Sequence, residues 1–285
     1  MGTSRIFPCT MMARAAMLLV LVIAGLGAVT GVGCEKKPAA SGSNQLTVLA
    51  AASLADAFRE VGAAFEATAL STKVEFSFGG SNQLRTQLEN GASGGVFASA
   101  DRKQMDAAVV SKVVDASTVR VFARNRLALI VPKSNPAGIK SLSDLARPGL
   151  KIVVADKAVP VGNYTRQMLA KAGEASEFGP SFVSAFDANT VSREENVAAV
   201  VAKIALNEAD AGIAYASDAA GSNGPKLTVL LLPAALEQQA EYVCAVITRA
   251  PDPKLAQRFI DFLVSKDASA ILSKRGFMGP DAGSR

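Results

Sequence analysis

The sequence predicts an α/β protein built from two similar halves. Short apolar segments of strand length alternate with amphipathic segments of helical period from Leu46 onward. The composition is that of a globular protein, with 49% apolar and 19% charged residues among 285. The alternation is interrupted between Pro132 and Pro136, which suggests two lobes. Alternating strands and helices favour parallel sheets covered by helices on both faces.

The first half supplies three strand–helix pairs and a closing strand. The helix at 54–68 places Leu54, Phe58 and Phe65 on one face, and the strand that follows alternates apolar and polar residues. The strands expected here are Leu46–Ala50, Lys73–Phe78, Gly95–Ser99 and Leu127–Val131, and the helices are 54–68, 82–90 and 102–110.

The second half repeats the alternation and ends with two helices. The strands expected here are Leu150–Val154, Ser181–Phe186, Gly212–Tyr215, Leu227–Leu231 and Tyr242–Thr248. The helices expected are 163–172, 197–206, 254–264 and 267–274. The organisation predicted is lobe 1 at 46–126, lobe 2 at 127–247, and a return to lobe 1 at 248–285.

The N-terminal segment reads as a targeting sequence. Arg5 and Arg14 precede an uncharged run from Ala15 to Cys34 that becomes rich in glycine. A basic start, an apolar run and a small-residue end predict a secretory signal peptide at 1–33. A retained membrane anchor is the alternative, since the run is close to the ~20 residues of a spanning helix.

Cys34 is a candidate lipidation site. Gly31-Val32-Gly33-Cys34 resembles a bacterial lipobox, although Gly31 stands where leucine is usual. The alternative is a chance cysteine near an ordinary cleavage site. Residues 34–45 read as a flexible tether, because they are rich in small and polar residues. The expected location is the periplasm or cell surface, as a membrane-anchored lipoprotein.

The composition excludes several functions. The chain has no histidine, so a Ser-His-Asp triad, a histidine proton shuttle and Cys₂His₂ zinc sites are ruled out. Three cysteines are too few for a disulfide framework, and Cys244 reads as a buried, unreactive thiol. Cleavage before Cys34 removes two of 30 basic residues and leaves 28 against 25 acidic ones, a net charge of +3. No basic cluster indicates a nucleic-acid partner.

Small and polar residues stand where strands give way to helices. The turns are Ala50–Ser53, Phe78–Asn82, Pro160–Tyr164 and Asn196–Val197. Taken singly, each is most simply an N-cap. Ligands of open α/β sheets bind at the carboxyl ends of strands, so these turns would face one crevice. Several helix N-termini that converge there make an anion site without a fixed positive charge.

Several segments resemble a known family. LTVLAAASLADAF, FSFGGSNQL, VFASADRKQMD, VPVGNYTRQML, GIAYASDA, EYVCAVIT and ILSKRGF are similar, in order and approximate spacing, to segments of the periplasmic molybdate-binding proteins. The similarity runs from about Leu46 to Met278. It implies a two-lobed type II periplasmic-binding-protein fold, with each lobe a mostly parallel sheet flanked by helices.

The resemblance also implies a ligand and five site residues. Residues matching the family's contacts are Ser53, Ser81, Val161, Val197 and Tyr215. The implied ligand is molybdate, with tungstate, and the implied partners are the permease and ATPase of an ABC transporter. A monomer without a cofactor is expected. The sequence departs from the family pattern at Gly79-Gly80, where a more serine-rich turn is usual, and at Val161, where alanine is common.

These residue types fit an oxyanion. A tetrahedral dianion offers only acceptors, so its site needs donors alone, and serine and tyrosine hydroxyls and backbone N–H groups are donors. A receptor for sulfate or another tetrahedral oxyanion is the alternative. An enzyme using Ser53 with Lys157 has no S-x-x-K spacing to support it, and Glu194-Glu195 would point to different faces. A purely structural surface lipoprotein does not account for so many similar turns.

Overall fold

A computed structural model describes residues 44–69 and 71–282. The predicted signal peptide, Cys34 and most of the predicted tether lie outside these residues. Within them, no helix is both long enough and apolar enough to cross a bilayer. The strands are β1 Asn44–Ala51, β2 Thr72–Gly79, β3 Val96–Ser99, β4 Arg120–Pro132, β5 Ile152–Ala155, β6 Thr190–Glu194, β7 Ala211–Tyr215, β8 Leu227–Leu231 and β9 Gln239–Val246.

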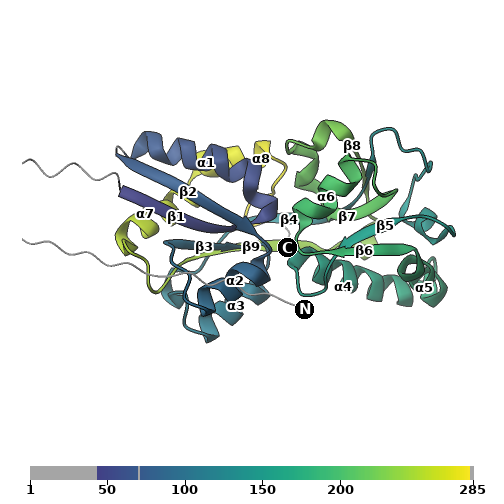
Figure 1. Ribbon diagram of the computed structural model, residues 1–285, viewed down its shortest axis with the longest axis horizontal. Helices are drawn as coiled ribbons and strands as arrows, with labels where there is room; N and C mark the ends of the chain where they lie inside the picture. The colour runs from purple at the N-terminus through teal and green to yellow at the C-terminus, as the bar shows by residue number, and fades with distance from the viewer. Residues whose placement is uncertain (1–43, 70, 283–285) are drawn as a thin grey trace, which may run out of the picture. The chain divides into compact units, whose positions relative to one another are not determined.

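Eight α-helices accompany these strands in the described part of the chain (Figure 1). They are α1 Ala55–Thr68, α2 Ser81–Glu89, α3 Arg102–Val110, α4 Pro160–Glu174, α5 Gly179–Asn189, α6 Val197–Ala205, α7 Pro253–Leu263 and α8 Lys266–Lys274. A short 3₁₀ turn, Ala52–Leu54, links β1 to α1. The predicted α/β class is therefore confirmed.

The strands follow the order β2-β1-β3-β9-β4-β7-β5-β6, and β8 pairs with β4. The pairs β1–β2, β1–β3, β5–β6 and β5–β7 are parallel. The antiparallel pairs among the described strands all involve β4 or β9. The parallel strands thus form two groups, one early and one late in the chain, with β9 and β4 between them.

Strand β4 belongs to both groups. Its first half, from Arg120 to Arg126, pairs with β9, and its second half, from Leu127 to Pro132, pairs with β7 and β8. The register with β9 shifts between Val121 and Ala123. One continuous strand therefore connects the sheet of β1–β3 with the sheet of β5–β7.

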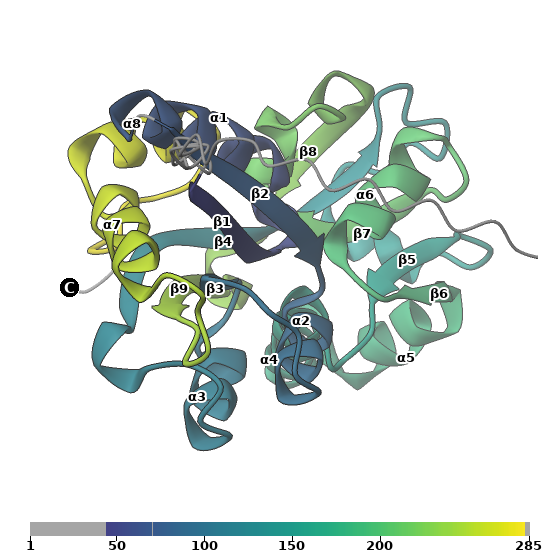
Figure 2. The same ribbon diagram turned by 60° about the vertical axis from the view of Figure 1, so that its left-hand side comes forward.

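Helices cover both groups of strands. In Figures 1 and 2, α1 and α8 lie on one face of the early strands, with α2 and α3 on the other; among the late strands, α6 lies opposite α4 and α5. The core is apolar, and its aromatic centre packs Phe58 and Phe65 of α1 against Phe259 of α7 with edge-on rings. Helices thus cover both faces of each group of strands. The ends of the strands are left uncovered, and the site forms there.

The structure corrects several element predictions. The segment Ser181–Phe186, predicted as a strand, is part of helix α5, because Phe182 and Phe186 are buried at a spacing of one helical turn. Strand β6, Thr190–Glu194, was not predicted, and its residues are mostly half-exposed or exposed. Strand β1 begins at Asn44, so the last two residues of the predicted tether belong to the sheet.

Strand β4 is also longer than predicted. Only Leu127–Val131 has the apolar character that indicates a buried strand. The preceding half was not predicted as a strand because it contains three charged residues, Arg120, Arg124 and Arg126. That half is held by its ladder with β9, which a local sequence pattern does not reveal.

Candidate functional site

A small cavity of about 10 Å³ lies where four helices begin. The first residues of the 3₁₀ turn before α1, of α2, of α4 and of α6 all line it. All five site residues expected from the sequence are among its thirteen lining residues. The lining residues are Ala51, Ala52, Ser53, Gly79, Gly80, Ser81, Ala100, Val159, Pro160, Val161, Asn196, Val197 and Tyr215.

Backbone N–H groups supply donors at each helix start. The first turn of a helix leaves its N–H groups without intrahelical partners, and the helix dipole makes that end electropositive. Pro160 is the first residue of α4, which suits its fixed φ, and Val161 follows with an N–H group. Asn196 caps α6 by accepting a hydrogen bond from the Ala199 N–H at 3.0 Å. Val197, the first residue of α6, lines the cavity, and the cap does not engage its N–H.

Ser81 is held as a hydrogen-bond donor to the cavity. It is 1% exposed, and its Oγ accepts a hydrogen bond from the Ala100 N–H at 3.0 Å. An amide N–H only donates, so this contact occupies a lone pair of the serine oxygen and leaves its proton available. Ser81 also starts α2, so its backbone N–H belongs to the same turn.

Ser53 has a partner that was not expected from the sequence. Its Oγ lies 2.8 Å from the Tyr242 hydroxyl, and Tyr242 is fully buried in β9. The two residues are 189 positions apart, so no local pattern could have paired them. Tyr242 appeared in the sequence only as part of an apolar strand.

Tyr215 brings an unpaired hydroxyl to the cavity. The residue is 1% exposed, and its Oη has no hydrogen-bond partner in the described part of the chain. Burial raises the pKa of Tyr215 well above its usual value, so the phenol keeps its proton. Its backbone N–H donates to Asp218 Oδ2 at 2.9 Å, which fixes the end of β7. A buried phenol without a protein partner is a donor ready for a ligand.

The lining of this cavity carries no formal charge, since none of its thirteen residues is acidic or basic. The cavity has room for about one water-sized sphere, which is too small for a sugar or a peptide. The arrangement supplies hydroxyl and backbone donors from five chain segments. Such a set matches an anion that offers only acceptors.

Gly80 allows the segments around the cavity to approach closely. A Cβ at this position would lie 2.7 Å from the carbonyl oxygen of Glu195, the residue before the Asn196 cap. Beside it, the Gln83 amide donates to Glu195 Oε2 at 3.1 Å. The Gly79-Gly80 pair, noted as a departure from the family pattern, thus lets α2 sit against the start of α6.

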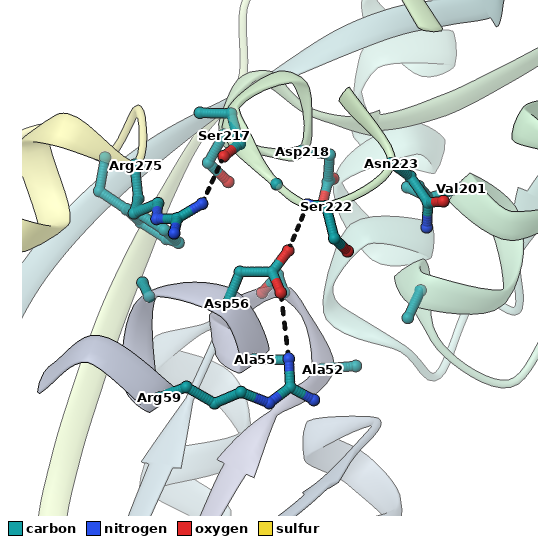
Figure 3. Close-up of a pocket in the computed structure, with 16 residues that line it drawn as sticks. Ala52, Ala55, Asp56, Arg59, Val201, Ser217, Asp218, Ser222, Asn223 and Arg275 are labelled. Carbon is teal, nitrogen blue, oxygen red and sulfur yellow. Dashed lines mark hydrogen bonds and ion pairs between the residues drawn. The ribbon is translucent and has the colours of Figure 1, made fainter. Parts of the chain in front are cut away.

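A second, charged cavity of about 190 Å³ adjoins the first and shares Ala52 and Ser53 with it. Figure 3 shows Asp56 of α1 between Arg59 and the backbone of Ser222. Asp56 Oδ2 accepts from the Ser222 N–H at 2.6 Å, and Asp56 Oδ1 pairs with Arg59 at 3.0 Å. Arg275 donates to the carbonyl of Ala220 at 2.9 Å and also pairs with Glu60.

The residues weighed for catalysis lie apart from the small cavity or are engaged elsewhere. Lys157 lines a groove between α4 and α5, and not the cavity that holds Ser53. Glu194 pairs with Lys203 at 2.7 Å, and Glu195 accepts from Gln83. Cys244 is fully buried, and burial raises the pKa of its thiol to about 12, as expected of an unreactive cysteine.

The comparisons with known proteins agree with this geometry. Residues 46–278 match the family model described as bacterial extracellular solute-binding protein. The chain is 35% identical to the molybdate-binding protein ModA of Mycobacterium tuberculosis over 262 residues, which covers 91% of this chain and 95% of that protein.

Two solved structures share the fold. The substrate-binding domain of a putative molybdenum ABC transporter from Clostridium difficile superimposes with a TM-score of 0.61 at 25% identity, covering 83% of this chain and 99% of the other. The periplasmic molybdate-binding protein of Azotobacter vinelandii gives a TM-score of 0.71 at 20% identity, with coverage of 82% and 99%. The expected two-lobed binding-protein fold is confirmed by these neighbours, and the chain belongs to the bacterial extracellular solute-binding proteins, within the family of the ModA molybdate-binding proteins.

Proposed function

We propose that this protein is an extracytoplasmic receptor that binds molybdate, and also tungstate, in the small neutral cavity and delivers it to an ABC importer. The observation that carries the proposal is the convergence of four helix starts, two serine hydroxyls and the unpaired Tyr215 hydroxyl on one charge-free cavity. The relatives named for molybdate or molybdenum transport support the choice of ion.

The proposed ligand contacts divide into two kinds. Ser53, Ser81 and Tyr215 would each donate a hydroxyl proton, and Val161 and Val197 would each donate a backbone N–H. Hydrogen bonds to a charged partner contribute roughly 1.5–3 kcal/mol each, so a set of this size can hold a dianion without a cation. In this proposal the protein binds the ion without chemical change, and the receptor acts as a monomer.

The proposal places the cavity between lobes formed by residues 46–126 with 248–285 and by residues 127–247. Ligand would favour a closed arrangement through the contacts it makes with both lobes. The permease and ATPase of the importer would take the ion from this closed form. The signal peptide at 1–33 would direct the chain across the membrane, and lipidation of Cys34 would hold the receptor at its outer face.

Isothermal titration calorimetry with molybdate, tungstate, sulfate and phosphate tests the function. We expect strong binding of molybdate and tungstate, and much weaker binding of the other two ions. Binding of sulfate without binding of molybdate would assign the receptor to sulfate or another tetrahedral oxyanion. Mass spectrometry of the mature protein purified from membranes would test the lipid on Cys34.

Single substitutions test the site. Ser53→Ala and Ser81→Ala should each weaken molybdate binding by about 1–3 kcal/mol, because each removes a donor to a charged ligand. Ser117→Ala is a matched control, since that serine is exposed and bonds only to nearby residues of its own loop. Unchanged affinity in both site variants would remove these serines from the proposed contacts.

A further inference from the structure

A groove of about 600 Å³ lies between α4 and α5 and is called the α4–α5 groove below. It is lined by one face of each helix and by residues from the ends of β5 and β6. It shares no lining residue with the small cavity or with the charged cavity. Its volume falls within the range of about 300–1,000 Å³ that is typical of sites for small organic molecules.

The side chains of α4 leave this space open. Gly162, Leu169, Ala170 and Gly173 lie on one face of the helix, because they are separated by whole helical turns, and three of the four are small. The two helices come close at Gly173, where a Cβ would lie 3.5 Å from the Val183 side chain. Larger residues on this face of α4 would fill the groove, as side chains do in an ordinary helix pair.

The inner lining of the groove is apolar. Val154 of β5, Leu169 of α4 and Phe186 of α5 all line it, and they are 5%, 9% and 1% exposed. Val183 of α5 is half-buried beside them. A hydrocarbon group placed against these side chains would be removed from water, which is favourable in proportion to the apolar area buried.

Charged residues gather where β5 and β6 end. The lining includes three basic residues, Lys157, Arg166 and Arg193, and one acidic residue, Asp187. Arg193 pairs in register with Val154 near the end of the β5–β6 ladder. Lys157 follows the last residue of β5 by two positions, and Arg166 lies in the first half of α4. The groove therefore combines an apolar lining with an excess of positive charge.

Two of the three basic residues have no acidic partner in the described part of the chain. Asp187 Oδ1 lies 3.5 Å from the Arg193 guanidinium, so this pair is balanced. Arg166 donates only to the neutral amide oxygen of Asn163, at 3.3 Å. Lys157 has no hydrogen bond or ion pair among the described residues. An anion in the groove would therefore meet two cations that the protein itself does not neutralise.

We propose that the α4–α5 groove is a second binding site of this protein, and that it takes an organic carboxylate with an apolar tail. The tail lies against Leu169 and Phe186, and the carboxylate meets Lys157 and Arg166. Guanidinium groups bind carboxylates through paired N–H donors, and an ammonium adds a compact positive charge. The Asp187–Arg193 pair is an example of the same contact within the chain.

The charges and the size of the groove select this class of ligand. A neutral molecule with an apolar tail would leave both cations without a counter-charge, and a cationic one would be repelled by them. A small carboxylate without a tail, such as acetate, would bury no apolar surface against Val154, Leu169 and Phe186. Charge and tail are thus both required, and each requirement is tested separately.

Isothermal titration calorimetry with three probes tests the ligand class. Sodium decanoate, kept below the concentration at which it forms micelles, should bind saturably with one molecule per chain. Decyltrimethylammonium has the same tail with the opposite charge and should bind at least about tenfold more weakly. Acetate should give no measurable binding. Equal affinities for decanoate and decyltrimethylammonium would overturn the proposal, and so would a failure of decanoate to bind.

Two variants test the location of the site. Lys157→Gln combined with Arg166→Gln removes both unpaired cations and should weaken decanoate binding about tenfold. Ala170→Leu fills the groove from an exposed position of α4 and should weaken it about tenfold or more. Thermal unfolding close to that of the wild type would show that both variants are folded. Molybdate binding should not change in either, because the small cavity has no residue in common with the groove.

Lys254→Gln combined with Arg258→Gln is the matched control. It removes the same two charges from exposed positions of α7, a helix that does not line the groove, and should leave decanoate affinity unchanged. An equal loss in the control and in the groove variant would overturn the proposal, because net charge alone would then explain the binding. Dimerisation that Ala170→Leu abolishes, without decanoate binding, would also overturn it and assign the groove to a second copy of the chain.

Discussion

Two adjoining cavities of this protein differ in how they use charge. The small cavity is lined by thirteen uncharged residues, and the larger one beside it includes Asp56, Arg59, Asp218 and Arg275. In the charged cavity, the ionic groups are engaged with the chain itself, as in the bond from Ser222 N–H to Asp56. In the neutral cavity, the Tyr215 hydroxyl has no partner in the described part of the chain.

The difference shows that uncharged donors line the proposed ligand site, whereas charged side chains hold segments of the chain together. A fixed cation in the small cavity would bind any anion, because a point charge attracts without regard to protonation or shape. Dipoles and hydroxyls at fixed positions select by hydrogen-bond geometry and direction. The ionic groups of the charged cavity instead connect α1 and the end of α8 to the segment 220–222. In that role they need not discriminate between ligands.

The largest effect is expected from moving a charge into the neutral cavity. Ser81→Asp would place a carboxylate against the bound dianion, where like charges cost several kcal/mol, so affinity should fall by about 1,000-fold or more. Asn223→Asp adds the same charge to the neighbouring cavity and should change affinity by less than about fivefold. Calorimetry measures both, and equal losses would contradict the distinction between the cavities.

The next effect concerns the pH dependence of stability. Burial raises the pKa of Asp218 to about 7, against a hydrogen bond from Tyr215 N–H that lowers it. Between the unfolded value of 3.8 and about 7, the folded chain binds a proton that the unfolded chain does not. Lowering the pH through this window therefore stabilises the fold, and raising it removes that stabilisation.

Asp218→Asn should abolish this contribution. We expect the free energy of unfolding of the wild type, relative to the variant, to rise as the pH falls from about 7 to about 4, by up to roughly 4 kcal/mol. Denaturant unfolding at a series of pH values measures the difference. A difference that is constant with pH would show that Asp218 is ionised throughout.

A smaller effect is expected from separating the walls of the neutral cavity. Gly80→Ala would set a Cβ 2.7 Å from the Glu195 carbonyl oxygen and should reduce molybdate affinity about 10- to 100-fold, because α2 and α6 must move apart. Gly79→Ala is the matched control, since its Cβ would meet only side chains, those of Leu84 at 3.3 Å and of Gln83 at 3.9 Å. Equal affinities in the two variants would show that the close approach at Gly80 is not needed for binding.

The smallest effect belongs to the charged cavity. Asp56→Ala removes the bond to the Ser222 N–H and should weaken molybdate binding about two- to fivefold, since a typical hydrogen bond contributes about 1 kcal/mol. Arg59→Ala removes an ion pair whose arginine is 63% exposed and the contact of its guanidinium with the Phe78 ring, and such exposed interactions contribute little. If Arg59→Ala were as damaging as Asp56→Ala, the ion pair and not the bond to Ser222 would matter.

The turns of the site could be predicted from the sequence because each is formed by residues that are close together in the chain. Ala50–Ser53 and Phe78–Asn82 combine a strand end, small residues and a helix start within a few positions, and the family resemblance selected one serine in each. The α/β class followed from the same local periodicities. The structure adds that these turns, together with Pro160–Val161 and Asn196–Val197, line one cavity.

Features that depend on pairing between distant segments could not be predicted from local sequence patterns. The bond between Ser53 and Tyr242 spans 189 positions, and the first half of β4 is a strand only because β9 lies beside it. The strand predicted at Ser181–Phe186 failed for a different reason. Its short apolar run suits either structure, and the packing of Phe182 and Phe186 as one face of α5 decides the outcome.

The unpaired Tyr215 hydroxyl has a consequence for the receptor without its ion. A buried hydroxyl that lacks a partner costs about 1–3 kcal/mol, and that cost is relieved when water or a ligand reaches it. We therefore expect the cavity to open readily when no ion is present and to stay shut when one is bound. A transporter that engages the shut form would then meet few unloaded receptors, and futile cycles of ATP hydrolysis would be rare.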